Sequence, residues 1–342
     1  MLYTRRDFGR VALAAGAAAT LAARKPSSNF GGVQIGIITY SFRALPGSAE
    51  ETLKYCVECG ISGIELMSNV AESYAGAPAQ PGRGFGPGGG PPPGAGRPGG
   101  ARPGPEGGRP SFTPEQQAAM QKAAEEMKQW RLSVSMDKYK AFRKMYERAG
   151  VKIYAFKLPP TTRMSDQEYA YIWNVAKTLG ANHVTMELPT DDALLQRVAA
   201  YAAYRKVPIA FHTHGQGGSS GFEKALGASR YTALNLDVGH YYGVTGQSPI
   251  PIIEKYHDRI ASLHLKDRKG PGSAAENAGP GGGGPNMPWG QGETPLKEIL
   301  QLMKKRKYGF PASIEYEYNT PEGSDVLTEI KKCVLFCKDA LA

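Results

Sequence analysis

Short apolar runs alternate with helix-length stretches along most of the chain. Eight of these runs have the length and the apolar character that are typical of buried strands. Strands that alternate with helices predict a parallel sheet, and eight such units predict its closure into a (β/α)8 barrel, the TIM barrel of the α/β class. The predicted strands cover residues 33–39, 63–67, 151–158, 183–188, 207–212, 233–237, 260–265 and 313–318.

Several of the predicted helices carry their own start and stop signals. Pro114 and Glu115 occupy the first turn of one helix, as helix starts prefer, and Gly150 and Gly180 follow two others as usual C-terminal stops. A chain of 342 residues is long enough for one barrel, which needs about 250 residues. The predicted helices cover residues 49–59, 113–131, 135–149, 165–179, 191–205, 222–228, 250–257, 294–305 and 325–341.

Residues 1–25 do not fit the barrel pattern. The pair Arg5-Arg6 and Phe8 precede an Ala-rich apolar run that reaches Ala23. A charged start, a short apolar run and small residues predict an export signal, and the arginine pair resembles a twin-arginine signal, so we expect a periplasmic protein. The run is shorter than the ~20 residues of a spanning helix, so we expect signal removal and no stable membrane span afterwards, with an uncleaved anchor as the alternative.

A second segment outside the pattern, residues 75–112, contains 14 Gly and 10 Pro. It offers too little apolar surface to offset its ordering entropy, so we predict a disordered insertion after the second strand. The predicted organisation is an export signal over residues 1–25 and one barrel over residues 26–342, interrupted at 75–112. Another Gly-rich stretch, Gly270–Pro285, is predicted to be a loop.

The formal net charge of +10 is concentrated outside the predicted barrel. Residues 75–112 carry four Arg and one Glu, and residues 1–10 carry three Arg and one Asp, so these segments hold half of the excess. Phosphate binding needs basic residues grouped on a folded face, so we expect no nucleic-acid partner.

The four cysteines form two pairs in the first and last predicted helices, which are neighbours in a closed barrel. An exported protein could join them in disulfides or hold a structural zinc ion, but we favour buried free thiols that pack as small apolar residues. The cysteines are Cys56, Cys59, Cys333 and Cys337.

Many of the predicted strands end in an acidic or imidazole side chain, which places these groups at the C-terminal face, where the active sites of this fold form. Taken singly, such a residue is more often a solvated group. Converging carboxylates repel one another unless a cation lies among them, and carboxylates with imidazoles suit Mn²⁺, Mg²⁺, Co²⁺ or Zn²⁺. We therefore expect one divalent metal ion among Glu187, His212, Asp237, His264 and Glu315.

Four motifs lie in the second half of the chain: Leu236-Asp237-Val238-Gly239-His240, His264-Leu265-Lys266-Asp267, Gly290-Gln291-Gly292-Glu293 and Ile314-Glu315-Tyr316-Glu317. Together they resemble the late-barrel motifs of the xylose isomerase-like sugar phosphate isomerase/epimerase superfamily. The resemblance runs from about Val33 to the C-terminus, without the insertion, and is strongest from His183 onward.

The resemblance implies metal ligation by Asp237, His264 and Glu315. In the ketose epimerases of this superfamily the fourth ligand is a Glu at the end of strand five, which also transfers a proton; here His212 takes its place. A subgroup that resembles the inosose dehydratases has a His-rich strand five and draws its Glu from strand four, an arrangement that Glu187 fits. We therefore predict the ligands Glu187, Asp237, His264 and Glu315, with His212 as the contested candidate.

Such a site supports proton transfer next to a carbonyl, through an enediolate that the metal stabilises. The candidate proton-transfer residues are Glu187, Glu315 and His212. The candidate substrate contacts are His240, which the resemblance implies, together with Lys157, His214 and Glu65. Lys157 is equally interpretable as a solvated lysine, Glu65 as a structural ion pair, and Lys266 with Asp267 as a pair that orients the seventh loop.

The predicted function is that of a sugar isomerase or epimerase. An exported enzyme meets few phosphorylated sugars, so the expected substrate is a free sugar, a keto-sugar or an inositol derivative. A dehydratase or a keto-glycoside-cleaving lyase shares the first proton abstraction and is the alternative. A catalytically silent carbohydrate-binding barrel is the non-enzyme alternative. An endonuclease of the related abasic-site family is disfavoured, because its site needs more metal ligands than this chain offers. Assembly into a homo-oligomer is left open.

Overall fold

The computed structural model describes residues 25–79, 113–214, 219–273 and 283–342. The predicted export signal and residues 80–112 of the predicted insertion lie outside these ranges. Within them, no helix combines the length and the hydropathy that a membrane crossing requires.

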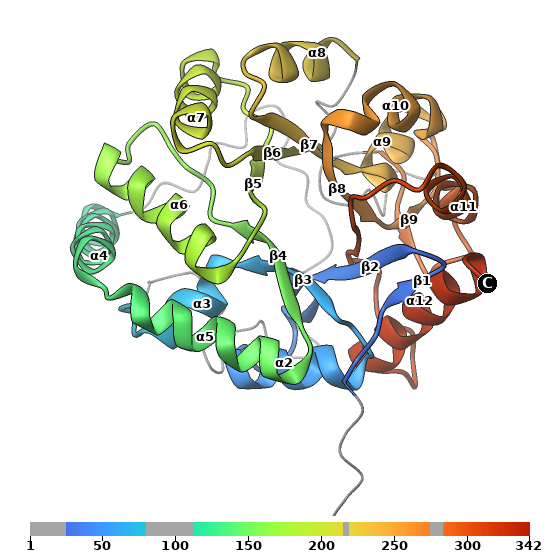
Figure 1. The fold of residues 1–342 in the computed structure, drawn as a ribbon, viewed down its shortest axis with the longest axis horizontal. Helices are drawn as coiled ribbons and strands as arrows, with labels where there is room; N and C mark the ends of the chain where they lie inside the picture. Colours follow the sequence, from blue (N-terminus) through green and yellow to red (C-terminus); the bar gives the residue numbers. More distant parts are fainter. Residues whose placement is uncertain (1–24, 80–112, 215–218, 274–282) are drawn as a thin grey trace, which may run out of the picture.

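The described residues confirm the predicted barrel. Eight parallel strands in these ranges form a ring, which closes because β2 pairs with β3 on one side and with β11 on the other. Figure 1 shows the ring with the helices around it. The strands of the ring are β2 (Val33–Ile38), β3 (Gly63–Met67), β4 (Lys152–Lys157), β5 (His183–Glu187), β6 (Ile209–His212), β7 (Thr232–Asp237), β8 (Ile260–Leu265) and β11 (Ala312–Ile314).

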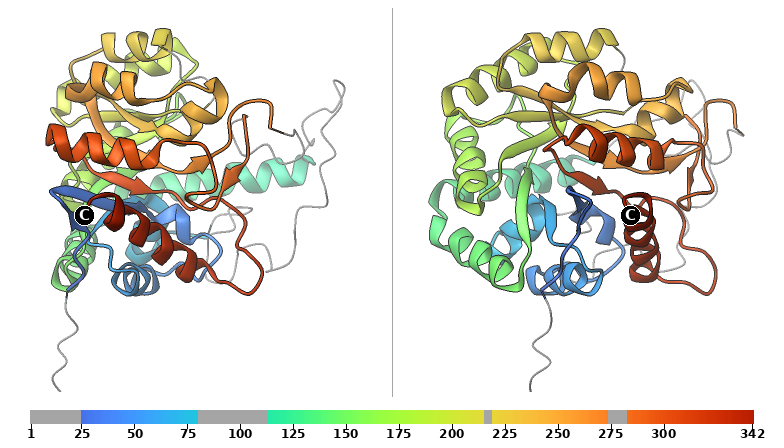
Figure 2. Two further views of the ribbon diagram at one scale, coloured as in Figure 1. Left: turned by 90° about the vertical axis from the view of Figure 1, so that its right-hand side faces the viewer. Right: turned by 45° about the vertical axis from the view of Figure 1, so that its right-hand side comes forward.

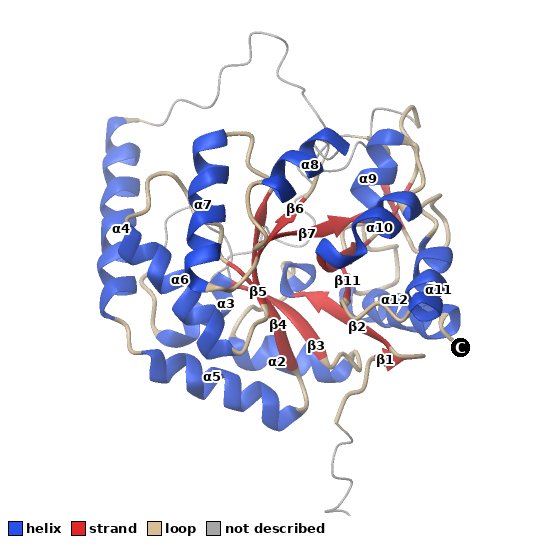
Figure 3. Ribbon diagram, turned by 45° about the horizontal axis from the view of Figure 1, so that its top comes forward, coloured by secondary structure: helices blue, strands red, loops and turns tan. Residues whose placement is uncertain are grey.

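The helices form the outer layer, as the colouring in Figure 3 shows. Their inner faces bury apolar side chains against the outward-facing residues of the strands. The helices are α2 (Ala49–Glu58), α3 (Ser68–Ala75), α4 (Pro114–Ser133), α5 (Met136–Ala149), α6 (Asp166–Leu179), α7 (Asp192–Arg205), α8 (Ser219–Gly227), α9 (Val238–Thr245), α10 (Ile250–Tyr256), α11 (Leu296–Arg306) and α12 (Val326–Ala340), with short 3-10 turns η1 (Thr39–Phe42) and η2 (His257–Arg259).

The ends of the helices follow from local chemistry. Ser48, Thr113 and Ser165 each cap a helix in a reciprocal pair with the Glu or Gln three residues later. Gly150 and Gly180 end α5 and α6 in the left-handed conformation, as predicted. These signals lie within one turn of chain, so the sequence alone could reveal them.

The last strand of the ring is shorter than the predicted 313–318. β11 ends at Ile314 because side chains of η1 and of Arg43, the residue that follows η1, take over the backbone hydrogen bonds beyond the strand. Ser41 Oγ accepts from Tyr316 N at 3.0 Å, and Arg43 Nη1 donates to Tyr316 O at 2.7 Å. Glu315 therefore follows the strand instead of lying within it.

Several short elements were not predicted. α3 follows β3 directly and includes Ala75, so the predicted insertion begins at least one residue too early. α9 follows β7, although its sequence contains two glycines. Short β elements were missed as well: β1 (Asn29–Phe30), antiparallel to β2, and the two-stranded pair β9 (Asp267–Arg268) and β10 (Asn286–Met287).

Polar side chains occupy the interior of the barrel. Glu65 on β3 accepts hydrogen bonds from Thr185 on β5 and Asn235 on β7, which are not its neighbours in the ring, so these bonds cross the interior. A Cβ at Gly36 would lie 2.4 Å from the hydroxyl of Tyr154, so only glycine leaves room for that ring. The interior is thus a hydrogen-bonded column beneath the C-terminal rim.

All four cysteines are free and buried. The first and last helices are neighbours, as predicted, because Lys331 Nζ on α12 lies 2.8 Å from Glu58 Oε1 on α2. Figure 2 shows α12 beside the first helices of the chain. Among the alternatives for the cysteines, the structure therefore has buried free thiols.

Candidate active site

Four side chains from neighbouring strands meet at the C-terminal rim of the barrel. Their potential ligand atoms all lie within 4.8 Å of one another, and all four residues are buried. They are His212 at the end of β6, Asp237 at the end of β7, His264 on β8 and Glu315 directly after β11.

Both ring nitrogens of His264 lie against carboxylates. Nδ1 is 2.6 Å from Glu315 Oε2, and Nε2 is 2.8 Å from Glu65 Oε2. An ionised carboxylate only accepts, so both nitrogens donate and the ring is an imidazolium. Burial alone would lower the pKa of His264, but the two carboxylates raise it to about 10. Burial likewise opposes ionisation of Glu65, yet His264 lowers the pKa of Glu65 to about 2.

Glu65 also orients His212, through Asn235. Asn235 Nδ2 donates to Glu65 Oε2 at 2.8 Å, which turns the amide oxygen toward His212 Nδ1, 3.3 Å away. The amide oxygen accepts, so Nδ1 carries the proton and Nε2 the lone pair. Burial, with Lys157 as the next cause, holds the pKa of His212 well below its ordinary value. The ring is therefore neutral, the form that binds metal ions.

Asp237 offers an oxygen that lacks a hydrogen bond. Its Oδ1 accepts from His240 N at 2.7 Å and so caps α9. Its Oδ2 accepts no hydrogen bond from the described residues, although Lys266 Nζ lies 3.0 Å away at ion-pair distance. Burial raises the pKa of Asp237 to about 6, against the effect of Lys266. A buried oxygen of this kind is costly unless a further cation completes its surroundings.

His240 lies between two cationic side chains. Its Nδ1 is 2.6 Å from Arg268 Nη1, and its Nε2 is 3.1 Å from Lys266 Nζ. Burial and Lys266 lower the pKa of His240 far below its ordinary value, so the ring is neutral. Arg268 is itself buried and donates from Nε to Gly284 O at 2.8 Å. His240 thus forms part of the wall of the site.

Two titratable side chains at the rim remain partly exposed. Glu187 at the end of β5 has 43% of its side chain exposed, and His214 has 33%. Lys157 Nζ donates to Glu187 Oε1 at 2.8 Å, while His214 Nδ1 lies 3.2 Å from Glu187 Oε2. Burial, followed by nearby lysines and opposed by Glu187, lowers the pKa of His214, so its ring is neutral at pH 7. These side chains can meet a ligand that enters from solvent.

The group of four residues fits a divalent metal ion. Two imidazoles and two carboxylates without a thiolate are typical donors for such ions. The Oδ2 of Asp237 and the Nε2 lone pair of His212 provide donor atoms, and His264 would lose one proton, as metal binding generally requires. Glu65 would then accept the remaining N–H of His264, as carboxylates do behind metal-bound histidines.

The predicted ligands and this group share three residues. Asp237, His264 and Glu315 lie together, and the fourth member is His212. Glu187 lies outside the group, paired with Lys157 on the open side of the rim. The geometry favours His212, the candidate that was contested, while the identity of the fourth ligand stays a prediction.

The residues predicted to contact substrate lie in different layers. Lys157 and His214 line the rim, and His240 lies behind His214, with ring centroids 4.5 Å apart. Glu65 is fully buried beneath the candidate ligands and accepts three hydrogen bonds there, from Thr185 and two other side chains. A substrate could not reach Glu65 without displacing a ligand, so its interpretation as part of a structural ion pair agrees with the structure.

Sequence reasoning missed part of the site, although a signal was present. Polar residues recur at every second position along β7, β8 and β11 and the residues that follow them, and alternation of this kind places them on one face. Continuing the alternation beyond Glu315 would have found Glu317, which lies 2.7 Å from Lys266. Asn235 precedes Asp237 by the same step. Arg268 continues the same alternation two positions beyond Lys266, so this signal could also have found it.

Asp267 holds the loop after β8 in place. Its Oδ2 accepts from Gly290 N at 2.8 Å and from Gly292 N at 2.9 Å, and its Oδ1 accepts from Thr294 N at 3.2 Å. A Cβ at Gly292 would lie 2.1 Å from Asp267 Oδ1, so glycine is required there for space. The loop-orienting role considered for Lys266 and Asp267 thus applies to Asp267 alone, because Lys266 turns into the site.

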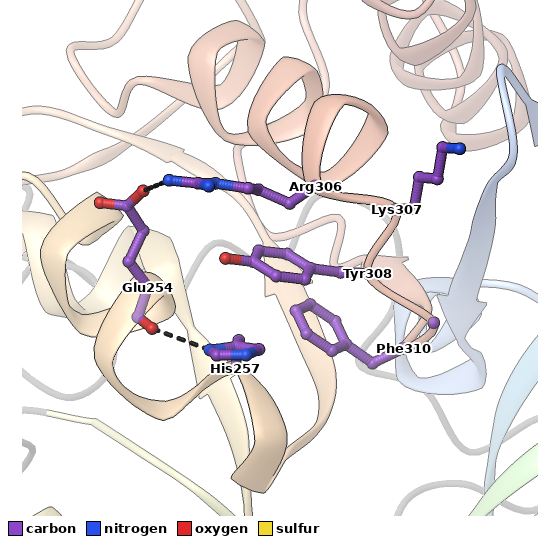
Figure 4. A pocket seen from close by; sticks show the side chains of 7 residues that line it. Glu254, His257, Arg306, Lys307, Tyr308 and Phe310 are labelled. Carbon is purple, nitrogen blue, oxygen red and sulfur yellow. Dashed lines mark hydrogen bonds and ion pairs between the residues drawn. The ribbon is translucent and has the colours of Figure 1, made fainter.

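A surface pocket of about 560 Å³ lies at the opposite rim, before the starts of β8 and β11 (Figure 4). Arg306 Nη2 lies 3.0 Å from Glu254 Oε1, and the ring of Tyr308 stacks between those of His257 and Phe310. Active sites of this fold form at the C-terminal face, so we assign the chemistry to the buried cluster and not to this pocket.

The fold and the site together define a TIM barrel with a candidate metal group at its C-terminal rim. A family model described as a xylose isomerase-like TIM barrel matches residues 193–333, a segment that contains all four residues of the candidate metal group. Comparison with curated proteins gives no match.

Among solved structures, a xylose isomerase domain protein from Alicyclobacillus acidocaldarius subsp. acidocaldarius has a TM-score of 0.57 at 13% identity, over 90% of this chain and 99% of that one. The probable 3-DHS dehydratase AsbF from Bacillus anthracis, involved in petrobactin synthesis, has a TM-score of 0.56 at 15% identity, over 88% of this chain and 98% of that one. An L-ribulose 3-epimerase has a TM-score of 0.51 at 13% identity, over 90% of this chain and 94% of that one. At these identities the likeness shows the fold.

Proposed function

We propose that this chain is a divalent-metal-dependent enzyme that moves a proton next to the carbonyl of a small carbohydrate, as a sugar isomerase or epimerase. One observation carries the proposal: the donor atoms of His212, Asp237, His264 and Glu315 lie within 4.8 Å of one another at the rim where this fold places its chemistry. The family match over residues 193–333 and the shared fold support it at a coarser level.

A bound divalent ion would supply a Lewis acid that polarises a carbonyl and stabilises negative charge. Glu187 is the candidate base, because it is partly exposed beside the candidate ligands. Lys157 holds Glu187 Oε1, while Oε2 accepts no hydrogen bond from the described residues. The neutral His214, 3.2 Å from Glu187 Oε2, is placed to exchange a proton with it or with the substrate.

The fate of the proton distinguishes the candidate reactions. Its return to the opposite face of the same carbon gives an epimer, and its delivery to the neighbouring carbon gives an isomer. Loss of a β-hydroxyl instead gives dehydration, so a dehydratase or a keto-glycoside-cleaving lyase is the second candidate; the shared fold with AsbF is compatible with it. The non-enzyme alternative, a carbohydrate-binding barrel, requires neither a metal ion nor proton exchange.

The proposed substrate is a non-phosphorylated sugar, keto-sugar or inositol derivative. This inference rests on the predicted twin-arginine export signal in residues 1–25, because few phosphorylated sugars occur outside the cytoplasm. Half of the formal net charge of +10 lies in residues 1–10 and 75–112, outside the predicted barrel, which argues against a nucleic-acid substrate. Recovery of the chain solely from the cytoplasmic fraction would remove the argument for free sugars.

The decisive experiment combines metal analysis with proton exchange. We expect the purified protein to bind divalent metal stoichiometrically and to exchange a substrate hydrogen with D₂O when given 3-keto-glucosides or inososes. Asp237→Asn and Glu315→Gln each remove a charged donor, so we expect metal affinity to fall by more than about 100-fold, beyond the usual effect of an outer-shell substitution. Elemental analysis and NMR measure the two quantities.

Glu254→Gln is the control, because it removes a carboxylate at the opposite rim, far from the candidate ligands in the barrel. It should leave metal content and exchange at wild-type levels. Equal and negligible metal in the wild type and all three variants would contradict the proposal and favour the carbohydrate-binding barrel.

A further inference from the structure

A buried lysine occupies the space between the carboxylates of the candidate metal site. Lys266 Nζ lies 3.0 Å from Asp237 Oδ2 and 3.0 Å from Glu315 Oε2, and both residues belong to the candidate ligand group. It also lies 2.7 Å from Glu317 Oε2, a carboxylate outside that group. Only 2% of the Lys266 side chain is exposed, so solvent screens its charge very little.

The surrounding structure is shaped to admit this side chain. A Cβ at Gly239, in the first turn of α9, would lie 2.2 Å from Lys266 Cγ. Any larger residue at position 239 would therefore displace Lys266. Glycine is required here for space and not for its backbone conformation, because Gly239 does not have a positive φ. The path of Lys266 into the cluster is thus built into the contact between α9 and β8.

Charge explains why a cation belongs there. Asp237, Glu315 and Glu317 bring three carboxylates into a buried region, and such groups repel one another unless cations lie between them. An ammonium group at 3 Å distance and a divalent ion would use the same oxygens of Asp237 and Glu315. The ammonium group and the divalent ion therefore compete for these oxygens.

We propose that Lys266 is the resident counter-ion of the metal site and that, when a divalent ion binds, it gives up Asp237 and Glu315 and keeps its existing pair with Glu317. Without the ion, Lys266 holds Asp237 and Glu315 together; with the ion, Glu317 keeps the ammonium paired within the same buried region. Glu317 is thus a positioning residue for Lys266. This inference rests on the metal site of the proposed function, and it adds a competition between an internal cation and the metal.

Metal affinity of matched variants tests the inference. Lys266→Met keeps an unbranched apolar stem, one atom shorter than that of lysine, and removes the charge, so we expect Mn²⁺ to bind about tenfold or more tightly, with a lower melting temperature of the metal-free protein. Glu317→Gln removes the second partner of Lys266, so we expect Mn²⁺ to bind about tenfold more weakly. Isothermal titration and thermal unfolding with and without Mn²⁺ measure both effects.

Lys157→Met is the matched control, because Lys157 is a second buried lysine at the rim whose ion pair is with Glu187, outside the ligand group. A general change of field would tighten Mn²⁺ binding equally in both lysine variants and would contradict displacement. A folded Lys266→Met variant with unchanged or weaker affinity contradicts it too, as does an unchanged affinity in Glu317→Gln. If the wild type binds Mn²⁺ but a variant gives one of these contradicting results, only the inference about Lys266 fails. If neither the wild type nor any variant binds Mn²⁺, the proposed function fails as well.

Discussion

Glu65 shows how one buried side chain organises a site at the scale of single residues. It accepts hydrogen bonds from Thr185, Asn235 and His264, at 2.7 to 2.8 Å, without any exposed surface. One of these bonds ends on a candidate ligand, and another leads through Asn235 to His212. Glu65 therefore sets the orientation of both imidazoles from beneath the rim.

Glu65→Gln tests this role. The amide keeps the shape of the side chain but replaces an accepting oxygen by a donor, so at least one of the three hydrogen bonds is lost and His264 loses one of its two anionic partners. Because carboxylates behind metal-bound histidines set tautomer and basicity, we expect metal affinity to fall by about 10-fold to 100-fold. Titration with Mn²⁺ provides the measurement.

Glu329→Gln is the matched control for that substitution. Glu329 is equally buried but pairs with Tyr318 and Ser324, away from the candidate ligands. It should change stability and leave metal affinity alone. Wild-type affinity in Glu65→Gln would show that Glu65 does not orient the ligands.

The sequence revealed the candidate ligands better than their supporting residues. Asp237, His264 and Glu315 end apolar runs, which is a local property of the chain. The choice between Glu187 and His212 depends on how far each side chain reaches across the rim, and that distance is not a property of either strand. Arg268 follows Lys266 by two positions, so the alternation marks it as a candidate, but its contact with His240 depends on the path of the chain at β9.

At the scale of elements, the chain ends two helices with an unusual residue. Lys206 after α7 and Lys307 after α11 adopt the left-handed conformation with φ of 53° and 56°, where glycine is the usual residue. A side chain costs about 1–2 kcal/mol in this conformation, against a smaller entropic cost of glycine in the unfolded chain. These positions are local weaknesses of the fold.

We expect Lys206→Gly to raise the free energy of unfolding by about 0.5–1 kcal/mol, because the relief of strain exceeds the added entropy of the unfolded chain. Denaturant-induced unfolding measures the change. Lys305→Gly, inside α11, is the control and should lower stability by about 1 kcal/mol, the usual cost of glycine in a helix. A loss of stability in Lys206→Gly would show that its side chain makes a contact worth more than the strain.

Element prediction succeeded where capping signals were local and failed where tertiary contacts compensated for weak propensity. Thr113 and Gly150 mark helix ends that were predicted within two residues. α9 was missed because glycines and β-branched residues disfavour a helix, yet Asp237 caps its first turn and Lys266 packs against Gly239. β11 ended early because η1, distant in sequence, supplied Ser41 as a hydrogen-bond partner.

At the scale of the whole molecule, the polar barrel interior links stability to pH. His183 on β5 is buried inside the ring, where its Nε2 lies 3.1 Å from Ser262 Oγ. Burial lowers the pKa of His183 to about 4. The folded protein therefore holds this imidazole neutral at a pH where the unfolded chain would already protonate it.

The sign of the pH effect follows from this difference. As the pH falls below the ordinary pKa of about 6.5, His183 binds a proton in the unfolded state but stays neutral in the folded state. The free energy of unfolding therefore decreases until about pH 4. The full effect of His183 is roughly 3 kcal/mol. Denaturant titrations between pH 7 and pH 4 should show a shallower decline in His183→Gln than in the wild type.

Substitution of the exposed His257, also by Gln, is the control for that comparison and should leave the decline as in the wild type. Parallel pH curves for wild type and His183→Gln would contradict the assignment. The remaining decline in His183→Gln includes the other buried histidines whose pKa is lowered, among them His212 and His240, and buried carboxylates such as Glu65.

The order and kind of the main elements followed from the sequence, because burial at regular intervals and capping are decided within a few residues. The register of the strands and the contacts across the closed ring were decided only in three dimensions. Register placed Asp237 level with His264, and closure brought Glu65 beneath both imidazoles and Lys266 among the carboxylates. Distances across a closed barrel depend on all of its strands at once, so no segment of the sequence contains them.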